Sequence, residues 1–334
     1  LDLIDNRLIT TLDVSNSSKL TSLTIDNNFY LSSINLNNAT ALKYFSAKNS
    51  YLFTLNLGTN VALTDLELDG NSNIKTLDLS KNVALNRLSI TNTNFRTLNV
   101  NNTALDGNNL NVQTSTSLRN LNISNTRISS IDLKNNRDLQ ILNTNNSSIE
   151  SLDLSKNTAL TSLFINNTTE LKHVTIDNTK RLTNVNFSSA TALLTLDASN
   201  SGILALDLSK NTAVTNLNVT NAAITSLNIS NTALQSSDFD LQAALSLKIL
   251  NISNTNINDL NLSKNTALTN LNANNSSIET LRLDKNTALT TLNINNASKL
   301  TYVNIDNTKK LSSLDISTAI ALTQLDAKNS GLSA

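Results

Sequence analysis

Apolar residues recur along the whole chain in short blocks of the form L-x-x-L-x-L. One such block is formed by Leu118, Leu121 and Ile123 in "SLRNLNIS". The apolar–polar–apolar alternation within a block predicts a short strand with two side chains in the core and one in solvent. Blocks follow one another at intervals of about 10 or 11 residues, so the sequence predicts an array of repeats with one strand in each.

Two kinds of block occur. One reads L-D-L-S-K-N-T-A-L after its leading apolar residue, with Asn at the ninth position, and the other reads L-N-I-S-N-T-x-I, with Asn at the eighth position and Thr or Ser at the ninth. A single block is too short to close a coil around a core, whereas two blocks suffice. The predicted fold is therefore a repeat solenoid, mainly β, in which a right-handed coil makes about 15 turns of roughly 21–22 residues.

The frequent asparagines fit the corners of such a coil. About 60 residues are Asn, and those at the ninth position keep a fixed spacing. An Asn side chain donates and accepts hydrogen bonds and tolerates the left-handed backbone otherwise left to glycine. We expect these residues to cap corners and to stack coil upon coil as an internal amide ladder, although they could instead merely decorate loops. The expected ladder consists of Asn82, Asn157, Asn211, Asn265 and Asn286.

A longer period lies over the short one. The stretch "NSSIESLDLSKNTALTSLFINN" begins at Asn146, and its near copy "NSSIETLRLDKNTALTTLNINN" begins at Asn275. We expect a single solenoid over 1–334 that arose by duplication of cassettes, with a divergent copy at 1–117, a second at 118–246 and a partial third at 247–334. The first residue is Leu and the last block is incomplete, so we also expect a fragment of a longer protein.

Two irregularities interrupt the regular array. The steps from Leu105 to Leu118 and from Leu234 to Leu247 are longer than the others and predict bulged corners or short helical turns. In addition, "DLSKN"-type blocks recur at odd block intervals, so strict alternation of the two kinds between the two sides of the coil must slip. Either both sides accept both kinds of block, or the coils change size locally.

Composition narrows the chemistry. The chain has 25 Lys and Arg against 25 Asp and Glu, a net charge of zero, and no Cys. We therefore expect no nucleic-acid partner, no cofactor and no Cys-based metal site, and no apolar run is long enough for membrane insertion. His173 has no partner at metal-ligand spacing and is expected on the surface. The weak Ca²⁺ candidates are Asp177 and Asp306. With no catalytic constellation, the sequence does not indicate an enzyme.

The repeats resemble a known family. "LSKNTALTSL", "LSKNTALTNL" and "LDKNTALTTL" are similar to the short leucine-rich repeats, of about 21 residues, in bacterial surface proteins of the internalin J type. The resemblance covers essentially the whole chain and implies a secreted or wall-attached bacterial protein that binds macromolecules through an open face of its array. That family carries a Cys ladder in one strand, and the matching positions here hold Thr144, Ala198, Val219 and Ile229.

The few aromatic residues are unevenly placed. Six of the eleven lie between Phe29 and Phe53, and Tyr30 and Tyr51 each precede a leading Leu one coil apart. Phe45 occupies a core position. The others are either a binding patch for a glycan or protein or extra core near one end. The candidate contact residues are Phe29, Tyr30, Tyr44, Tyr51, Phe53 and Phe164.

Three classes of function follow. The first is an extracellular adhesin or recognition module that binds a host or cell-surface protein or glycan. The second is a structural stalk or a filament subunit that associates end to end. The third is an ice-binding surface, for which regular outward rows of Thr are expected but not found.

Overall fold

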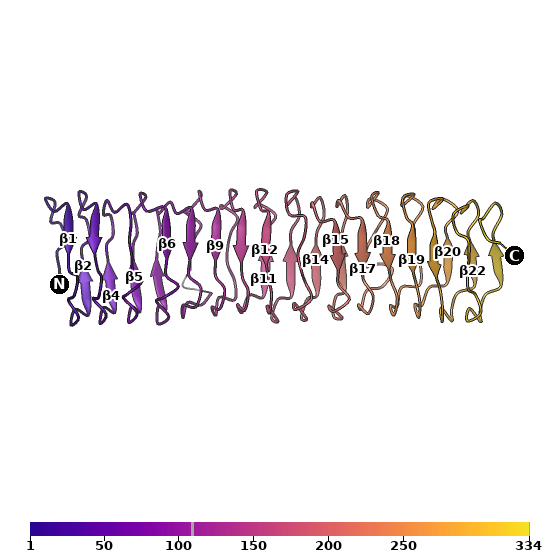
Figure 1. Cartoon of the computed structure of the whole chain (residues 1–334), viewed down its shortest axis with the longest axis horizontal. Coiled ribbons are helices and arrows are strands. Elements are labelled where there is room, and N and C mark those ends of the chain that lie inside the picture. Colours follow the sequence, from indigo (N-terminus) through magenta and orange to yellow (C-terminus); the bar gives the residue numbers. More distant parts are fainter. Residues whose placement is uncertain (108–109, 334) are drawn as a thin grey trace. The chain divides into compact units, whose positions relative to one another are not determined.

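The computed structural model describes residues 1–107 and 110–333, which form strands and turns without a helix. Residue contacts divide the chain into two compact units, Leu1–Thr168 and Thr169–Ala334. Each unit is a stack of β coils (Figure 1). The described residues make about 14 turns in the two units together, close to the 15 expected. The cassettes and the single solenoid over 1–334 stay predictions.

Every strand of the described residues is three residues long. Each is centred on the first apolar residue of L-x-L, so the expectation of two core side chains within one strand is wrong: the second apolar residue, such as Leu154, follows the strand at the corner. In the first unit the strands are β1 (Thr11–Asp13), β2 (Ser22–Thr24), β3 (Ser33–Asn35), β4 (Tyr44–Ser46), β5 (Asp65–Glu67), β6 (Thr76–Asp78), β7 (Arg87–Ser89), β8 (Thr97–Asn99), β9 (Asn120–Asn122), β10 (Ile141–Asn143), β11 (Ser151–Asp153) and β12 (Ser162–Phe164). Parallel pairing within this unit gives the sheets β1–β3, β2–β4–β5–β7 and β12–β10–β9–β8–β6.

The second unit repeats this organisation. Its strands are β13 (His173–Thr175), β14 (Thr195–Asp197), β15 (Ala205–Asp207), β16 (Asn216–Asn218), β17 (Ser226–Asn228), β18 (Ile249–Asn251), β19 (Asn270–Asn272), β20 (Thr280–Arg282), β21 (Thr291–Asn293), β22 (Tyr302–Asn304) and β23 (Gln324–Asp326). Within this unit β13–β14–β16, β15–β17–β18–β19–β21 and β20–β22–β23 pair in parallel.

The register places equivalent residues of successive coils side by side. Leu23 lies opposite Phe45, and Phe45 lies opposite Leu66. All three side chains are buried in the core between the two sides of the coil. Paired strands are about 4.8 Å apart, so these side chains form a continuous apolar column. Each coil therefore depends on its neighbours for the burial of its apolar residues.

Both sides of the coil accept both kinds of block. In the second unit, the stretch "LDLSKN" begins within β15 and the similar stretch "LRLDKN" begins within β20. These two strands belong to different sheets. The expectation that strict alternation of the two kinds between the sides must slip is therefore confirmed, and the first of the two explanations holds. Hydrogen-bonded equivalents in successive coils are 21 to 23 residues apart, so small changes in corner length leave the register intact.

The longer steps are accommodated at corners. No residue described between Leu105 and Leu118, or between Leu234 and Leu247, is helical, so the alternative of a short helical turn is wrong for them. Residues 108 and 109 of the first step lie outside the described residues. In the second step the Asp238 N–H donates to the Gln235 carbonyl, and the Gln235 N–H donates to the Asp238 carboxylate at 2.7 Å. The extra residues thus form a closed turn, and β17 and β18 remain in register.

An Asp or Asn between the two apolar positions of a block shapes the corner that follows. The Asp153 carboxylate accepts the Ser155 N–H at 3.0 Å, and the Asn261 side-chain oxygen accepts the Ser263 N–H at 3.1 Å. Such a bond to the second residue along is an Asx turn, which only a short polar side chain can make. An Asp or Asn between the two apolar positions therefore stabilises the backbone turn in addition to facing solvent.

Asn at the ninth position links successive coils. The Asn82 amide nitrogen donates to the main-chain carbonyls of Leu57 and Asn60 in the preceding coil, at 3.1 and 2.9 Å. The same pair of bonds is made by the buried Asn157, Asn211, Asn265 and Asn286. Each amide thus bonds backbone, not the next amide. Sequence reasoning did not name four further fully buried corner asparagines, which are Asn28, Asn60, Asn71 and Asn136.

The left-handed backbone expected at the ninth-position asparagines is found at other residues, so that expectation is wrong. Positive φ occurs at the eighth position, for example 55° at Asn125, 54° at Asn146 and 56° at Asn167. Their side chains form the amide-to-amide ladder on the surface: Asn146 donates to Asn125 at 2.8 Å, and Asn167 donates to Asn146 at 2.9 Å. In these blocks the ninth residue is Thr or Ser, and the Thr126 hydroxyl donates to the Ile123 carbonyl within its own corner.

Candidate macromolecule-binding surface

Four of the candidate contact residues lie on one edge of the first unit, where β2 and β4 end and the chain turns toward the opposite side of the coil. Phe29, Tyr30, Tyr51 and Phe53 are 50, 65, 49 and 50% exposed. The alternative that these rings extend the core is not what the structure shows. Leu31 and Leu52, which are fully buried, fill the core at this corner instead.

The rings are held in place by their neighbours. Tyr51 and Phe53 flank the buried Leu52, and their rings meet edge to face with centroids 5.0 Å apart. This arrangement is the favoured geometry for two aromatic rings. Because adjacent residues anchor the backbone in the core, the exposed rings form a fixed surface and need little ordering when a partner binds.

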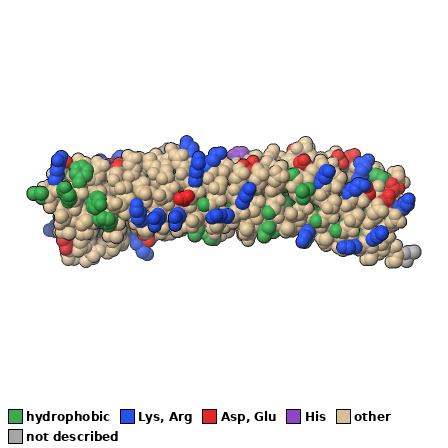
Figure 2. All heavy atoms as spheres, turned by 90° about the horizontal axis from the view of Figure 1, so that it is seen from above, with side chains coloured by type: hydrophobic (Ala, Val, Ile, Leu, Met, Phe, Trp, Pro, Cys, Tyr) green, Lys and Arg blue, Asp and Glu red, His purple; other side chains and the backbone are tan. Residues whose placement is uncertain are grey.

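Sequence reasoning missed one member of this surface. Leu8 precedes the leading residue Ile9, as Tyr30 precedes Leu31, and it is 94% exposed. The signal was this equivalence of position one coil earlier. We call Leu8, Phe29, Tyr30, Tyr51 and Phe53 the edge patch. Hydrophobic side chains gather toward the left of the view in Figure 2, over the N-terminal strands.

The remaining aromatic candidates lie elsewhere. Tyr44 begins β4, at the end of the strand away from the edge patch, and it is only partly exposed. Phe164 ends β12 on the sheet surface, opposite Asn143, and is 44% exposed. Phe45 is fully buried, as its core position predicts. The structure thus brings together four of the six candidate residues and separates Tyr44 and Phe164 from them.

A charged network adjoins the edge patch. The Lys48 ammonium lies 2.6 Å from the Glu67 carboxylate and 3.5 Å from that of Asp26. The hydrogen bond to Glu67 is the main cause that raises the pKa of Lys48 above its usual value. Asp26 also accepts the Ser46 hydroxyl and the Lys48 N–H, at 2.6 and 2.8 Å. These bonds connect three successive coils and fix the corner beside the exposed rings.

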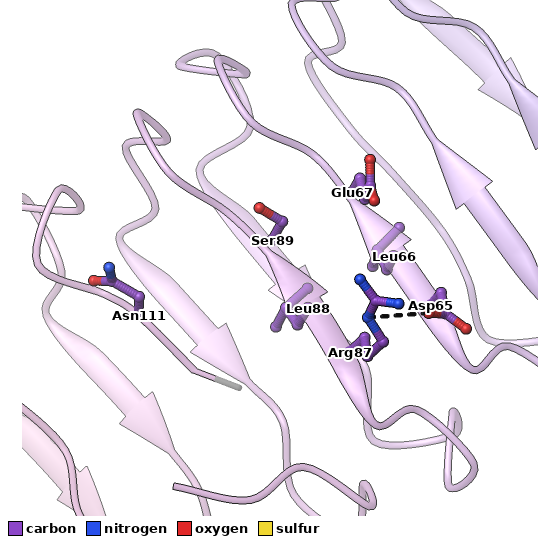
Figure 3. Close-up of a pocket in the computed structure, with 7 residues that line it drawn as sticks. All are labelled: Asp65, Leu66, Glu67, Arg87, Leu88, Ser89 and Asn111. Atoms are coloured by element: carbon purple, nitrogen blue, oxygen red, sulfur yellow. Dashed lines mark ion pairs between the residues drawn. The ribbon is translucent and has the colours of Figure 1, made fainter. Parts of the chain in front are cut away.

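The strand faces carry shallow hollows. Figure 3 shows one on the sheet β2–β4–β5–β7, where Asp65 and Arg87 form an ion pair at 3.4 Å beside Glu67 and Ser89. Its apolar floor consists of core leucines that are already almost fully buried. Within the described residues, no three His, Cys, Asp or Glu side chains converge as metal ligands, and no helix is long and apolar enough to span a membrane.

The two Ca²⁺ candidates are engaged in hydrogen bonds between coils. One Asp177 carboxylate oxygen accepts the Ser199 hydroxyl and the Asn200 amide, at 3.0 and 2.9 Å. Asp306 accepts the Lys328 N–H at 2.6 Å. Ca²⁺ requires six to eight oxygen ligands, whereas these carboxylates face hydrogen-bond donors. The observed role of both residues is to fasten one corner to the next.

His173 lies exposed at the start of β13. Its Nδ1 atom is 2.9 Å from the Thr195 hydroxyl in the next coil. Because Thr195 is its register neighbour in β14, the contact is part of the strand surface.

Comparison with known proteins gives similarity to solved structures only, since no family model and no curated protein matches the chain. The functional domain of InlJ from Listeria monocytogenes is 24% identical over 88% of this chain and 71% of that chain, with a TM-score of 0.34. A leucine-rich-repeat protein of Leptospira interrogans is 14% identical over 96% of each chain, with a TM-score of 0.32. YopM from Yersinia enterocolitica is 18% identical over 93% of this chain and 78% of that chain, with a TM-score of 0.33.

The matched structures include internalins, in agreement with the resemblance drawn from the repeats. The InlJ domain includes a cysteine ladder, whereas this chain has no Cys. Thr144, Ala198, Val219 and Ile229, which the resemblance places at the matching positions, are buried here. At these identities and TM-scores the matches carry no argument about function. The chain is a β-solenoid built of leucine-rich repeats of about 21 residues.

Proposed function

We propose that this chain is a non-enzymatic recognition solenoid that binds a macromolecular partner through the edge patch. One observation carries the proposal: five large apolar side chains, four of them aromatic, lie exposed together on one edge of the first unit. Single exposed apolar residues are ordinary on protein surfaces, whereas a group of rings on a rigid backbone is typical of binding sites. Tyr is also enriched among the residues that dominate binding free energies.

The proposed setting is the bacterial cell surface or the extracellular medium, where the protein would act in adhesion. This part rests on the similarity of the "LSKNTALTSL" repeats to those of internalin-type surface proteins. The absence of Cys makes the stability of the coils independent of redox conditions. A repeat array also suits display, because successive coils extend a surface without requiring a new core.

The test is a binding screen against matrix proteins and surface glycans with three forms of the protein. The double variant Tyr30→Ser, Tyr51→Ser removes two rings from the edge patch and leaves the buried leucines in place. Val83→Ser is the matched control, because Val83 is 57% exposed on the opposite edge of the same unit. We expect the double variant to bind at least about tenfold more weakly and the control to bind as the unchanged protein does.

Unchanged affinity in the double variant would contradict the proposal, provided that circular dichroism shows the same thermal unfolding for all three forms. Sedimentation velocity on the same samples measures the alternative function. Polymers that grow with protein concentration, together with no ligand in the screen, would instead support a stalk or filament subunit.

A further inference from the structure

Beside the edge patch the same edge carries a row of cations. Lys75, Arg96 and Arg119 each follow a buried leading residue in successive coils and are exposed. The Arg96 N–H donates to the Lys75 carbonyl at 2.7 Å, and the Arg119 N–H donates to the Arg96 carbonyl at 2.9 Å. The three backbones are therefore direct neighbours, about 4.8 Å apart. We call Lys75, Arg96 and Arg119 the basic row.

The cations of the basic row are not neutralised by acidic side chains. In the described part of the chain none of the three forms an ion pair, and the Lys75 ammonium donates only to the Ser72 carbonyl, at 2.7 Å. The strand residues that follow them are the uncharged Thr76, Thr97 and Asn120.

One acidic group lies nearby on the other side of this edge. The carboxylate oxygens of Asp69 accept bonds from the Ser89 hydroxyl and the Thr91 N–H and hydroxyl. Three like charges at this spacing repel one another, so the basic row costs stability in the free protein.

The basic row continues the edge patch. Phe53 follows the buried Leu52 just as Lys75 follows the buried Ile74 one coil later. One edge of the first unit thus presents exposed rings and then, along the same line, a series of cations. We infer that the partner is a protein whose binding segment carries an apolar anchor for the edge patch and, next to it, acidic residues that lie along the basic row. This inference rests on the proposed function, because it specifies the partner of the same surface.

Two observations favour an acidic protein segment over a nucleic acid or an acidic glycan. Leu8, the most exposed member of the edge patch, is aliphatic, so it gains from covering by apolar side chains but cannot stack a base or a sugar. The chain has no net charge, whereas a nucleic-acid surface is usually strongly basic. The Asp and Glu side chains of such a segment also fit the basic row, because the planar guanidinium of Arg binds a carboxylate through two parallel hydrogen bonds.

A library of random 20-residue peptides displayed on yeast tests the inference with the whole chain as bait. We expect the selected peptides to combine apolar residues with an excess of Asp and Glu over the starting library. Their affinity should fall about tenfold for the variant Lys75→Ala, Arg96→Ala, Arg119→Ala at low salt, and the difference should shrink as salt is added. The matched control is Lys19→Ala, Lys43→Ala, Lys81→Ala, which removes the same charge from exposed positions on the opposite edge.

Each other outcome overturns the inference in a distinguishable way. Peptides that lose affinity for the Tyr30→Ser, Tyr51→Ser protein but not for the basic-row variant would leave the proposed function standing and refute the acidic segment. An equal loss of peptide affinity in the control variant would show that the effect arises from net charge and not from the basic row. Tighter binding of a 20-nucleotide oligo-dT or of alginate than of any peptide would assign the surface to another class of polymer. Failure to enrich any peptide would refute the inference. If the binding screen against matrix proteins and surface glycans also finds no ligand, the proposed function is refuted as well.

Discussion

The side-chain amide of Asn286 donates to the main-chain carbonyl of Asn265, one coil earlier, at 2.8 Å. It also donates to the Leu262 carbonyl at 3.1 Å, and Asn265 makes the equivalent pair of bonds to the coil before it. Since both neighbouring atoms are carbonyl oxygens, the amide nitrogen must face them. Each of these corner carbonyls also accepts a backbone N–H within its own coil, from Asn265 and Leu268, so the Asn286 amide bonds the second lone pair of each. A buried Asn thus supplies the bonds that strand pairing cannot.

Replacement of Asn265 by Ala should destabilise the protein. The change removes two hydrogen bonds to buried carbonyls, each of which keeps one backbone donor, so we expect the free energy of unfolding to fall by about 1–3 kcal/mol. Urea unfolding followed by circular dichroism measures the change. The control is Asn293→Ala, on the exposed end of β21, which should change the free energy of unfolding by less than about 0.5 kcal/mol. Equal effects at the two sites would show that the buried amide is not what stabilises the corner.

The surface ladder makes a different prediction. Asn146 has a φ of 54° and bonds Asn125 and Asn167 through its side chain. A left-handed backbone costs most L-residues about 1–2 kcal/mol, whereas Gly adopts it freely. We expect Asn146→Ala to lower the free energy of unfolding by about 1–2 kcal/mol and Asn146→Gly by clearly less, as measured by urea unfolding. The natural Gly70 at a φ of 78° takes the equivalent position in another coil. If Gly were as destabilising as Ala, the side-chain bonds and not the backbone would dominate.

The asparagines also show how far the sequence could predict the fold. The strands, their alternation and the burial of the ninth position follow from local patterns, because a strand has a period of two and the blocks repeat. The assignment of left-handed backbone to the ninth position failed. Asn suits both a buried donor site and a positive φ, and the sequence alone does not say which property a given Asn serves. The difference depends on the preceding coil, to which Asn82 bonds but Thr126 does not.

The candidate site was predictable in part for a similar reason. The spacing of Tyr30 and Tyr51 indicates equivalent corners, and the structure places both exposed on one edge. Leu8 was missed because a Leu in this sequence is normally a core residue. The basic row was missed because a net charge of zero conceals an uneven distribution. Whether a residue is exposed, and which charges lie together, depends on the side of the coil to which its block belongs. The sequence alone does not assign the blocks to the two sides.

Phe164 tests whether exposed aromatic residues act singly. It lies on β12, whereas its counterpart in the near copy of this stretch is Asn293. Because the structure separates Phe164 from the edge patch, we expect Phe164→Asn to change neither the affinity for a ligand of the edge patch nor the free energy of unfolding by more than about 0.5 kcal/mol. Titration of a fluorescent ligand and urea unfolding measure the two quantities. A loss of affinity comparable to that of Tyr30→Ser, Tyr51→Ser would extend the binding surface to β12.

The pair Tyr302 and Asp326 predicts a pH dependence. The Tyr302 hydroxyl donates to the Asp326 carboxylate at 2.7 Å, and this bond is the main cause that raises the pKa of Tyr302 and lowers that of Asp326. Asp326→Asn should therefore shift tyrosine ionisation, followed by absorbance at 295 nm, to lower pH. A raised pKa means that the bond stabilises the fold below the unfolded pKa of about 10 and ceases to do so as pH rises through the folded pKa. Asp315→Asn, whose carboxylate bonds Ser317, should leave the titration unchanged. An identical shift in both variants would show that the carboxylate acts through net charge and not through its bond to Tyr302.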